Sequence, residues 1–425
     1  MPTIVNGKPA WFYEAQKRSA AVSPRAVVKD FLRTKYTEQE IHNIETLLAT
    51  NQEPLLWVNT LAQSEEEGLA CLCDAGYTLT CAPLQLGEYH LYQPSDLDMN
   101  AFEQDPLFSE GTVVATDCAA LSVVQLAADA AIERAQALGY FDKQQEAECV
   151  EEGSATLNAD MPELEEGETA EGEVVAQKAL GSEALESEAA ESEETEQERT
   201  EQEVAEPEAP ANTISVVELC AGTGNMTLPF YTTITQKLQE QKANVALQHV
   251  ACEINTEAFT ALDARVNAQE GCTIEARHMD ARRFREDSKF DVLVLDAPCV
   301  DATTFPLSDN DQSKVFHQEE VVRYSSLQKS LFLLALGMMK PGSVLLYTTT
   351  SLFAAENEEV IRTSLARSGS LGTFELVDFD LPHLSTAEGE EAQAQQLRTT
   401  GENMCLIAPG KYSPARFIAK IARTS

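Results

Sequence analysis

From residue 214 onward, the sequence alternates short apolar runs with segments of helical periodicity. The run at 290–296 is almost continuously apolar, which is typical of a strand buried on both faces. Strands that alternate with helices favour a parallel sheet covered by helices on both faces. We therefore predict an α/β fold with a doubly wound, Rossmann-like sheet. The predicted strands are 214–218, 245–252, 273–277, 290–296 and 343–348, and the predicted helices are 226–241, 256–267 and 318–339.

A short turn with two glycines follows the first predicted strand. The strand ends at Glu218, the turn covers residues 220–225, and a helical pattern begins after it. Strand, turn and helix in this order present backbone N–H groups at the start of the helix. Gly222 and Gly224 carry no side chain that would keep a ligand away from that backbone. A Gly-x-Gly pair is a weak signal by itself, so the ends of the other strands decide whether this turn belongs to a ligand site.

Polar or reactive side chains stand at or just after the ends of four predicted strands. They are Glu218, Glu253, Asp280, Asp296 and Cys299. Parallel strands end at the same edge of a sheet, and ligands of open α/β sheets bind outside that edge. We therefore predict one site that is formed by these residues and the glycine turn.

Two of these acids indicate the class of ligand. Glu253 can accept hydrogen bonds from two ribose hydroxyls, and Asp280 can reach an adenine amino group. The turn lacks the Lys-Ser/Thr pair of a triphosphate site. S-adenosylmethionine has a ribose, an adenine and a sulfonium but no phosphate, so we predict it as the cofactor. Two alternatives stay open: the NAD-type cofactor of a dehydrogenase, and a structural role of both acids as caps of the strand ends.

The residues that we expect to contact the cofactor come from the turn and from the strand ends. They are Cys220, Ala221, Gly222, Thr223, Gly224, Asn225, Met226, Glu253, Asp280 and Asp296.

The sequence before this alternating pattern divides into two regions. Residues 1–140 mix helical and strand-like segments and predict a small α+β domain. Trp57 is interpreted as a core residue of this domain, with a base-stacking role as the alternative. Residues 141–212 are rich in Glu, Ala and Ser, with 23 acidic and two basic residues between 146 and 208. The segment has few large apolar residues, so it cannot bury enough surface to offset the conformational entropy that folding costs. We therefore predict a disordered acidic linker. Residues 213–425 are the third predicted domain.

The ten cysteines show no spacing that is typical of a metal site. Neither a signal peptide nor an apolar run of membrane length is evident. We expect free thiols in a reducing, cytoplasmic protein with no metal and no membrane association. The sequence does not indicate the oligomeric state.

Several stretches together resemble the RsmB/NOP/Sun family of RNA 5-methylcytosine methyltransferases. The family's first motif, Asp-x-Cys-Ala-Ala-Pro-Gly-Gly-Lys-Thr, corresponds to residues 218–227, and its Asp-Ala-Pro-Cys motif is intact at 296–299. Its Tyr-Ser-Thr-Cys-Ser and Glu-Asn-Glu stretches correspond to 347–351 and 356–358. The resemblance implies a methyltransferase fold, S-adenosylmethionine as cofactor, and RNA, by preference ribosomal RNA, as substrate. Weaker similarities occur in family order at 57–60, 108–117, 327–333, 341–343, 407–409 and 417–420.

The resemblance also implies which residues are catalytic, and here the sequence departs from the family. Methylation of cytosine at C5 needs a thiolate that adds to C6 and a base that removes the C5 proton. The family's nucleophilic cysteine corresponds to Thr350, whose hydroxyl is too weakly acidic for this role. Cys299 corresponds to the family's helper cysteine, and a Pro-Cys cysteine is the nucleophile of DNA cytosine methyltransferases. We expect a catalytic site that contains Cys299, Asp296 and the substituted position Thr350.

Other departures weaken the case for RNA binding. Met226 replaces the lysine of the first motif, and Asp301 follows the Asp-Ala-Pro-Cys motif closely. Residues 1–140 resemble the family's N-terminal RNA-binding domain, but Trp57 replaces an arginine there. Phosphate contacts need Lys and Arg, yet about half of the net charge of −40 lies outside the acidic linker. A basic cluster at 277–285 is interpreted either as an RNA contact or as a solvated turn balanced by Glu286 and Asp287.

Two hypotheses from different classes therefore follow. The first is an active RNA cytosine-C5 methyltransferase that uses Cys299. The second is a degenerate relative that keeps the fold and acts as a binding or assembly factor.

Overall fold

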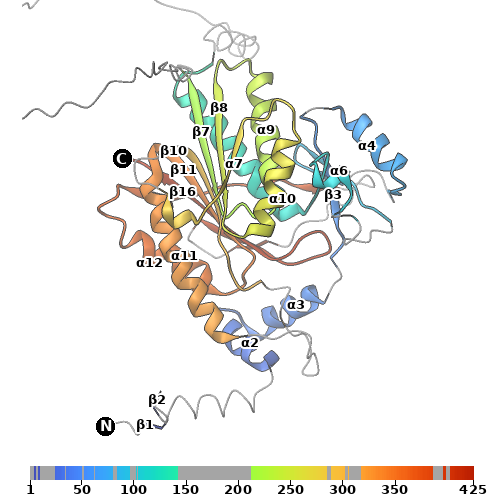
Figure 1. Cartoon of the computed structure of the whole chain (residues 1–425). Coiled ribbons are helices and arrows are strands. Elements are labelled where there is room, and N and C mark those ends of the chain that lie inside the picture. Colours follow the sequence, from blue (N-terminus) through green and yellow to red (C-terminus); the bar gives the residue numbers. More distant parts are fainter. Residues whose placement is uncertain are drawn as a thin grey trace, which may run out of the picture. The chain divides into compact units, whose positions relative to one another are not determined.

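Nine strands form one sheet among the residues that the computed structural model describes (Figure 1). Five neighbours are parallel, in the order β11 (Met339–Thr349), β10 (Phe290–Asp296), β7 (Thr213–Leu219), β8 (Ala246–Glu253) and β9 (Ile274–His278). Beyond β11 follow the antiparallel strands β16 (Arg416–Arg423), β15 (Met404–Ile407) and β14 (Gln396–Arg398), while β12 (Phe374–Val377) also pairs with β16. The described residues are 4–5, 8–9, 24–33, 35–49, 52–61, 63–79, 84–95, 102, 104–141, 212–284, 289–301, 305, 317–385, 396–398 and 403–425.

The predicted doubly wound sheet is confirmed. Each of the five predicted strands overlaps one of the five parallel strands, and the helix predicted at 256–267 has those bounds. The helix predicted to end at residue 339 ends at Met338, because β11 already begins with Met339. The sheet is larger than the predicted one, since the antiparallel strands near the C-terminus extend it.

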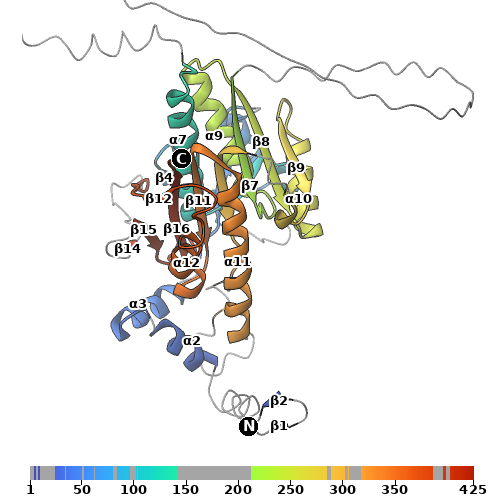
Figure 2. The same cartoon turned by 90° about the vertical axis from the view of Figure 1, so that its left-hand side faces the viewer.

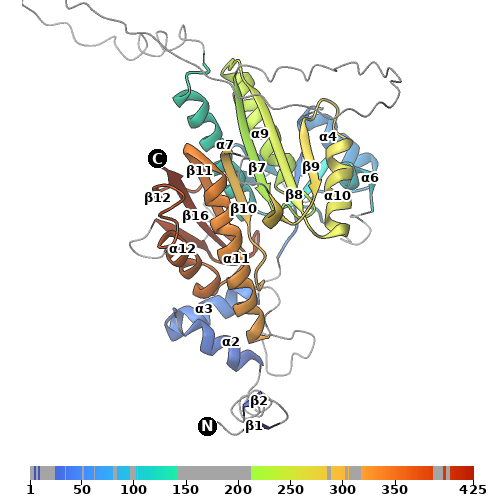
Figure 3. The same ribbon diagram turned by 60° about the vertical axis from the view of Figure 1, so that its left-hand side comes forward.

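Helices cover both faces of the sheet (Figures 2 and 3). One face packs against α7 (Cys118–Ala137), α9 (Thr227–Glu240) and α10 (Thr256–Asn267), and the other against α11 (Gln318–Met338) and α12 (Glu358–Leu365). Two further helices, α2 (Pro24–Leu32) and α3 (Glu38–Leu48), lie beside α11 and α12 and share their apolar cluster.

The alternation of side chains along β7 explains why both faces are covered. Ile214 and Val216 belong to the apolar cluster of α7, α9 and α10. Val217 and Leu219 belong to the cluster of α11 and α12. Successive strand residues point to opposite faces, so an unbroken apolar run needs helices on both sides.

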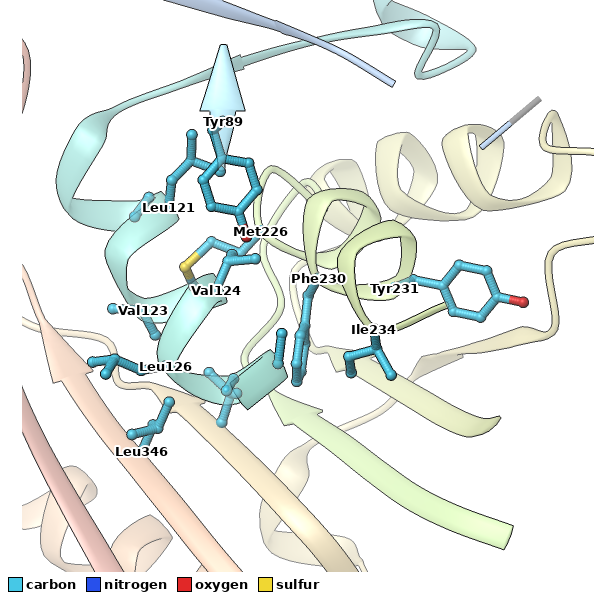
Figure 4. Packing of buried hydrophobic residues seen from close by; sticks show 14 of the residues in the cluster. Tyr89, Leu121, Val123, Val124, Leu126, Met226, Phe230, Tyr231, Ile234 and Leu346 are labelled. Carbon is cyan, nitrogen blue, oxygen red and sulfur yellow. The ribbon is translucent and has the colours of Figure 1, made fainter. Parts of the chain in front are cut away.

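Helix α7 comes from the region before the acidic segment, yet it packs on the sheet. Its alanine-rich surface allows a close approach to α9, and Figure 4 shows Leu121 and Val124 of α7 beside Met226. Near its end, Arg134 Nε donates to Asp291 Oδ1 over 3.0 Å. Asp291 stands at the start of β10, so this pair fastens the last turn of α7 to the sheet.

The remaining elements are short. β3 (Leu55–Val58) pairs with β6 (Val113–Thr116), and β4 (Leu84–Leu86) pairs with β5 (Tyr89–Leu91) and with β13 (Leu384–Ser385). Two more helices, α4 (Glu65–Asp74) and α6 (Pro106–Ser109), and the strand pair β1 (Ile4–Val5) and β2 (Lys8–Pro9) complete the N-terminal region. Trp57 is 6% exposed, which confirms its predicted place in the core.

The described residues from 4 to 141 and from 212 to 425, with the gaps given above, lie in one compact unit. The predicted linker at 141–212 lies almost wholly outside the described residues, so its disorder stays a prediction, as does the division at residue 140. None of the helices in the described ranges combines the length and the apolar content that crossing a membrane requires.

Candidate active site

The glycine turn after β7 has an unusual backbone. Cys220, Gly222 and Gly224 all have positive φ, at 64°, 59° and 85°. At Gly224, a Cβ would also lie 2.8 Å from Leu262 Cδ1 of α10, so both conformation and space favour glycine there. The left-handed Cys220 is costly for a residue with a side chain, and such strain concentrates at functional sites.

Part of the turn is held by a buried arginine of α10. Arg265 Nη1 donates to the Thr223 carbonyl over 2.7 Å and to Asn225 Oδ1 over 2.6 Å. Met226 is 8% exposed and lies among Tyr89, Leu121 and Val124 (Figure 4). The side chain of Asn225 is therefore bonded to Arg265, and that of Met226 is packed in the core. We did not identify Arg265 from the sequence as a residue that holds the turn.

Glu253, at the end of β8, is bonded to the turn. Its Oε2 accepts from Gly222 N over 2.8 Å, and its Oε1 accepts from Asn255 N over 2.7 Å. A carboxylate has about four acceptor positions, so one position on each oxygen stays open. Two vicinal hydroxyls of a ribose would fill this pair, so Glu253 fits the predicted adenosyl ligand.

A narrow pocket of about 70 Å³ opens beside Glu253, at the carboxyl ends of four parallel strands. Its walls are mostly apolar, as the faces of an adenine ring require. Ile254 is 56% exposed although it is apolar, and it lines this pocket. Ile254 directly follows Glu253, and this pattern of a large apolar residue after a strand-end acid could have identified it from the sequence. The lining residues are Cys220, Cys252, Ile254, Met279, Asp280, Ala281, Arg282, Pro298, Leu327 and Leu331.

Asp280 lines the pocket, but Arg282 already occupies its carboxylate. Arg282 Nη2 donates to Asp280 Oδ2 over 2.6 Å, and Arg282 N donates to Oδ1 over 3.0 Å. The Arg282 guanidinium lowers the pKa of Asp280, although partial burial opposes it. An adenine amino group would have to share this carboxylate with Arg282, whose side chain is 54% exposed.

Two arginines of the basic cluster have acidic partners in the part of the chain that the structure describes. Arg277 is paired with Glu275 over 2.7 Å, and Arg282 with Asp280. The expected partners, Glu286 and Asp287, lie outside the described residues. The neutralised Arg277 and Arg282 weaken the interpretation of this cluster as an RNA contact.

The two predicted catalytic positions lie side by side. Cys299 Sγ is 3.3 Å from Thr350 Oγ1, although the residues come from loops after different strands, β10 and β11. Both loops start at paired positions, since Asp296 faces Thr348 in the register of β10 and β11. The one thiol of this catalytic pair, that of Cys299, therefore lies beside Thr350, the position where the resemblance predicts the nucleophile.

The surroundings of Cys299 disfavour its thiolate. Burial raises the pKa of the Cys299 thiol to about 12, and the carboxyls of Glu356 and Asp296 add to this effect. Glu356 lies in the 3₁₀ turn η3 (Ala354–Glu356), where it accepts from Val300 N over 3.0 Å and from the Ser351 hydroxyl. Burial raises the pKa of Glu356 to about 7. Glu356 thus fastens the two catalytic loops to each other, a role that the sequence motif alone did not indicate.

Asp296 forms an ion pair with a residue that we did not foresee. Arg416 Nη1 lies 3.2 Å from Asp296 Oδ1, and the side chain of Arg416 is 7% exposed. Arg416 is the first residue of β16, which is antiparallel to β11 and so begins where the parallel strands end. A lone arginine far along the chain carries no local signal for this contact.

Comparisons with known proteins agree with this geometry. A family model described as "16S rRNA methyltransferase RsmB/F" matches residues 207–421. Ribosomal RNA small subunit methyltransferase F of Pectobacterium atrosepticum is 28% identical over 215 residues, which are 49% of this chain and 40% of that protein. Human tRNA (cytosine(72)-C(5))-methyltransferase NSUN6 is 27% identical over 36% of this chain and 33% of its own length.

Among solved structures, that of NSun6 from Pyrococcus horikoshii with SFG has a similar fold. The TM-score is 0.54 with 13% sequence identity, and the match covers 93% of this chain and 97% of that one. The curated relatives named above are matched over less than half of their length. Because the family model covers half of the chain and its motifs meet at one edge of the sheet, the chain belongs to the RsmB/F family of 16S rRNA methyltransferases.

Proposed function

We propose that the protein is an S-adenosylmethionine-dependent RNA methyltransferase that acts on C5 of cytosine, with Cys299 as its nucleophile. The observation that carries this proposal is the 3.3 Å separation of Cys299 Sγ and Thr350 Oγ1. A thiol so close to the family's nucleophile position can reach the same carbon of a bound base by a change of rotamer. The proposed substrate is ribosomal RNA, because several of the similar curated proteins are named for it. The cytoplasmic location expected from the sequence stays a prediction.

Separate residues of the chain would bind the cofactor, attack the base and orient it. Glu253 and the pocket beside it would hold the cofactor, which supplies an electrophilic methyl group when bound. The Cys299 thiolate adds to C6 of the cytosine, which makes C5 nucleophilic. After methyl transfer a base removes the C5 proton, the S–C6 bond breaks and the thiolate leaves. Asp296 lies at the start of the same loop, where it can hydrogen-bond the base.

Replacing Glu253 by Gln is expected to weaken cofactor binding about 10- to 100-fold. The amide keeps the shape but loses the charge, and a hydrogen bond to a charged group contributes about 1.5–3 kcal/mol. Titration calorimetry with S-adenosylmethionine measures the change. Glu257→Gln, a charge removed from the first turn of α10, is the matched control and should bind as wild type does. Equal affinity of Glu253→Gln and wild type would contradict the assignment of the ribose site.

Methyl transfer by wild type should be slow, dependent on Cys299 and steeply dependent on pH. With the pKa of Cys299 near 12, the thiolate fraction rises about tenfold per pH unit below that value. We therefore expect transfer of tritiated methyl to undermodified ribosomal RNA to rise about tenfold from pH 8 to pH 9. Cys299→Ala should abolish it. Transfer that survives this substitution would refute Cys299 as the nucleophile, whereas a flat profile between these pH values would contradict the raised pKa of its thiol.

A second candidate function is favoured by the same electrostatics. The carboxyls of Glu356 and Asp296 oppose formation of the thiolate at this edge, and Met226 supplies no positive charge where the family has a lysine. They support a protein that binds the cofactor or a partner without turnover, as a binding or assembly factor. Cofactor binding with no detectable transfer to any RNA, in wild type and in Thr350→Cys alike, would favour this candidate.

A further inference from the structure

We propose that Asp117 and Arg416 are positioning residues of the active site: Arg416 holds the Asp296 carboxylate beside Cys299, and Asp117 shares and moderates the charge of Arg416. We call these three residues the Asp117–Arg416–Asp296 network. The inference rests on the proposed function for its role in catalysis. Asp117 lies outside residues 207–421, the part of the chain that the family model matches.

The geometry of the network places one cation between two carboxylates. Arg416 Nη1 lies 3.2 Å from Asp296 Oδ1, and Arg416 Nη2 lies 4.0 Å from Asp117 Oδ2. Arg416 Nη1 also donates to Thr348 Oγ1 over 3.4 Å. Asp296 ends β10, Thr348 lies in β11, and Arg416 begins β16. Asp117 directly precedes α7.

Burial makes this arrangement electrostatically significant. Arg416 is 5% exposed, and its Nε is buried without a hydrogen-bond partner among the described residues. A buried guanidinium is tolerated only when carboxylates compensate its charge, so Arg416 depends on Asp296 and Asp117. Burial raises the pKa of Asp296, the Arg416 guanidinium lowers it, and the carboxylates of Asp117 and Glu218 raise it again. Arg416 thus keeps Asp296 closer to its ionised form than burial alone would.

The two oxygens of Asp117 have separate roles. Oδ1 accepts from Ala120 N over 2.8 Å and so caps α7, while Oδ2 faces Arg416. Asparagine is as good an N-cap as aspartate, so Asp117→Asn removes the charge and keeps the cap. This separation allows the electrostatic role to be tested without disturbing the helix.

Arg416 also acts on the thiol. Its charge and a Cys299 thiolate attract each other, whereas the carboxylates of Glu356 and Asp296 repel that thiolate. Removing the negative charge of Asp117 leaves more of the Arg416 charge uncompensated, which favours the thiolate. Removing the positive charge of Arg416 has the opposite effect.

The test is the rate at which iodoacetamide alkylates Cys299 in the full-length protein, followed between pH 7 and pH 9.5 by peptide mass spectrometry. We expect Asp117→Asn to alkylate about three- to tenfold faster than wild type at pH 8, and Arg416→Gln about as much slower. Arg416→Lys should restore most of the wild-type rate. Cys71 and Cys73, both exposed on α4, serve as internal references whose rates should not change.

Asp105→Asn is the matched control, because Asp105 caps α6 in the same way, with Oδ1 accepting from Leu107 N over 2.9 Å. It should leave Cys299 unchanged. A fold that is merely loosened would speed alkylation in every variant, so opposite signs for Asp117→Asn and Arg416→Gln separate electrostatics from loosening. If Arg416→Gln does not fold, Asp117→Asn decides alone, and an unchanged Cys299 rate overturns the proposal. Alkylation needs neither RNA nor cofactor, so its outcome is independent of whether methyl transfer is found.

Discussion

Thr350→Cys should raise the rate of methyl transfer to RNA by about 100-fold over wild type. The substitution places a second thiol beside Cys299, where Thr350 Oγ1 now lies 3.3 Å from Cys299 Sγ. One sulfur can then add to C6 while the other assists proton removal, and a positioned acid or base contributes about 10²–10⁴-fold. Tritiated methyl transfer to undermodified ribosomal RNA, measured in the presence of a reductant, provides the rate.

Thr350→Ser is the matched control for this gain. It keeps a hydroxyl at the same position and removes only a methyl group, so it should transfer no faster than wild type. Combining Thr350→Cys with Cys299→Ala tells which thiol adds to the base: retained transfer assigns addition to the introduced thiol, and lost transfer assigns it to Cys299. A Thr350→Cys variant that binds cofactor yet transfers no faster than wild type would contradict the prediction.

Asp291→Ala should destabilise the protein by about 3–5 kcal/mol, because it leaves buried or half-buried cations without their partner. Asp291 is 1% exposed, and its carboxylate is bonded to Lys340 Nζ over 2.6 Å, to Arg134 Nε and to Ser215. For a chain of this size we expect the Tm to fall by about 10 °C. Thermal unfolding followed by circular dichroism measures this change.

The same carboxylate predicts a dependence of stability on pH. Burial raises the pKa of Asp291, but bonds from Lys340, Ser215 and Arg134 outweigh it and lower the pKa below its ordinary value. A carboxyl whose folded pKa is lowered stabilises the protein above its unfolded pKa of about 3.9, and this contribution is lost as the pH falls through the folded pKa. The difference in Tm between wild type and Asp291→Asn should therefore be largest near neutral pH and shrink below about pH 4.

An exposed pair provides the comparison. Arg33 and Glu38 lie 2.6 Å apart, but both side chains are about half exposed or more. Glu38→Gln should leave the Tm unchanged within error, since surface ion pairs contribute little. A Tm of Asp291→Ala within about 2 °C of wild type would show that Arg134 and Lys340 find water or other partners.

The fold and the site could be predicted from the sequence where the signal is local or periodic. The apolar runs at 214–218 and 290–296 predicted parallel strands, because burial on both faces needs uninterrupted apolar residues. The acid at the end of β8 and the glycine turn were correctly placed at one edge, since parallel strands share their carboxyl ends. The pairing of Cys299 with Thr350 followed from the family resemblance and not from any periodicity.

Contacts between distant segments could not be predicted in this way. Arg416 faces Asp296 across 120 positions of sequence, and Arg265 holds a turn 40 positions before it. Nothing in the sequence around either arginine specifies a partner, because the partner is chosen by the order of strands and helices in space. Even Met226, which we expected beside the cofactor, lies in the core because α7 covers it.

The ion pair between Arg134 and Asp291 affects where this chain tolerates insertions. It holds the last turn of α7 near the first residues of β7 and β10, since Ser215 also donates to Asp291. The point where the chain leaves α7 and the point where it returns to β7 are thus kept together by the fold itself. Each doubling of a flexible loop costs only about 0.6 kcal/mol when its ends are already fixed. This junction, at the edge of the sheet opposite the catalytic cysteine, is therefore a permissive place for insertions, and a reporter domain placed there should leave the chemistry undisturbed.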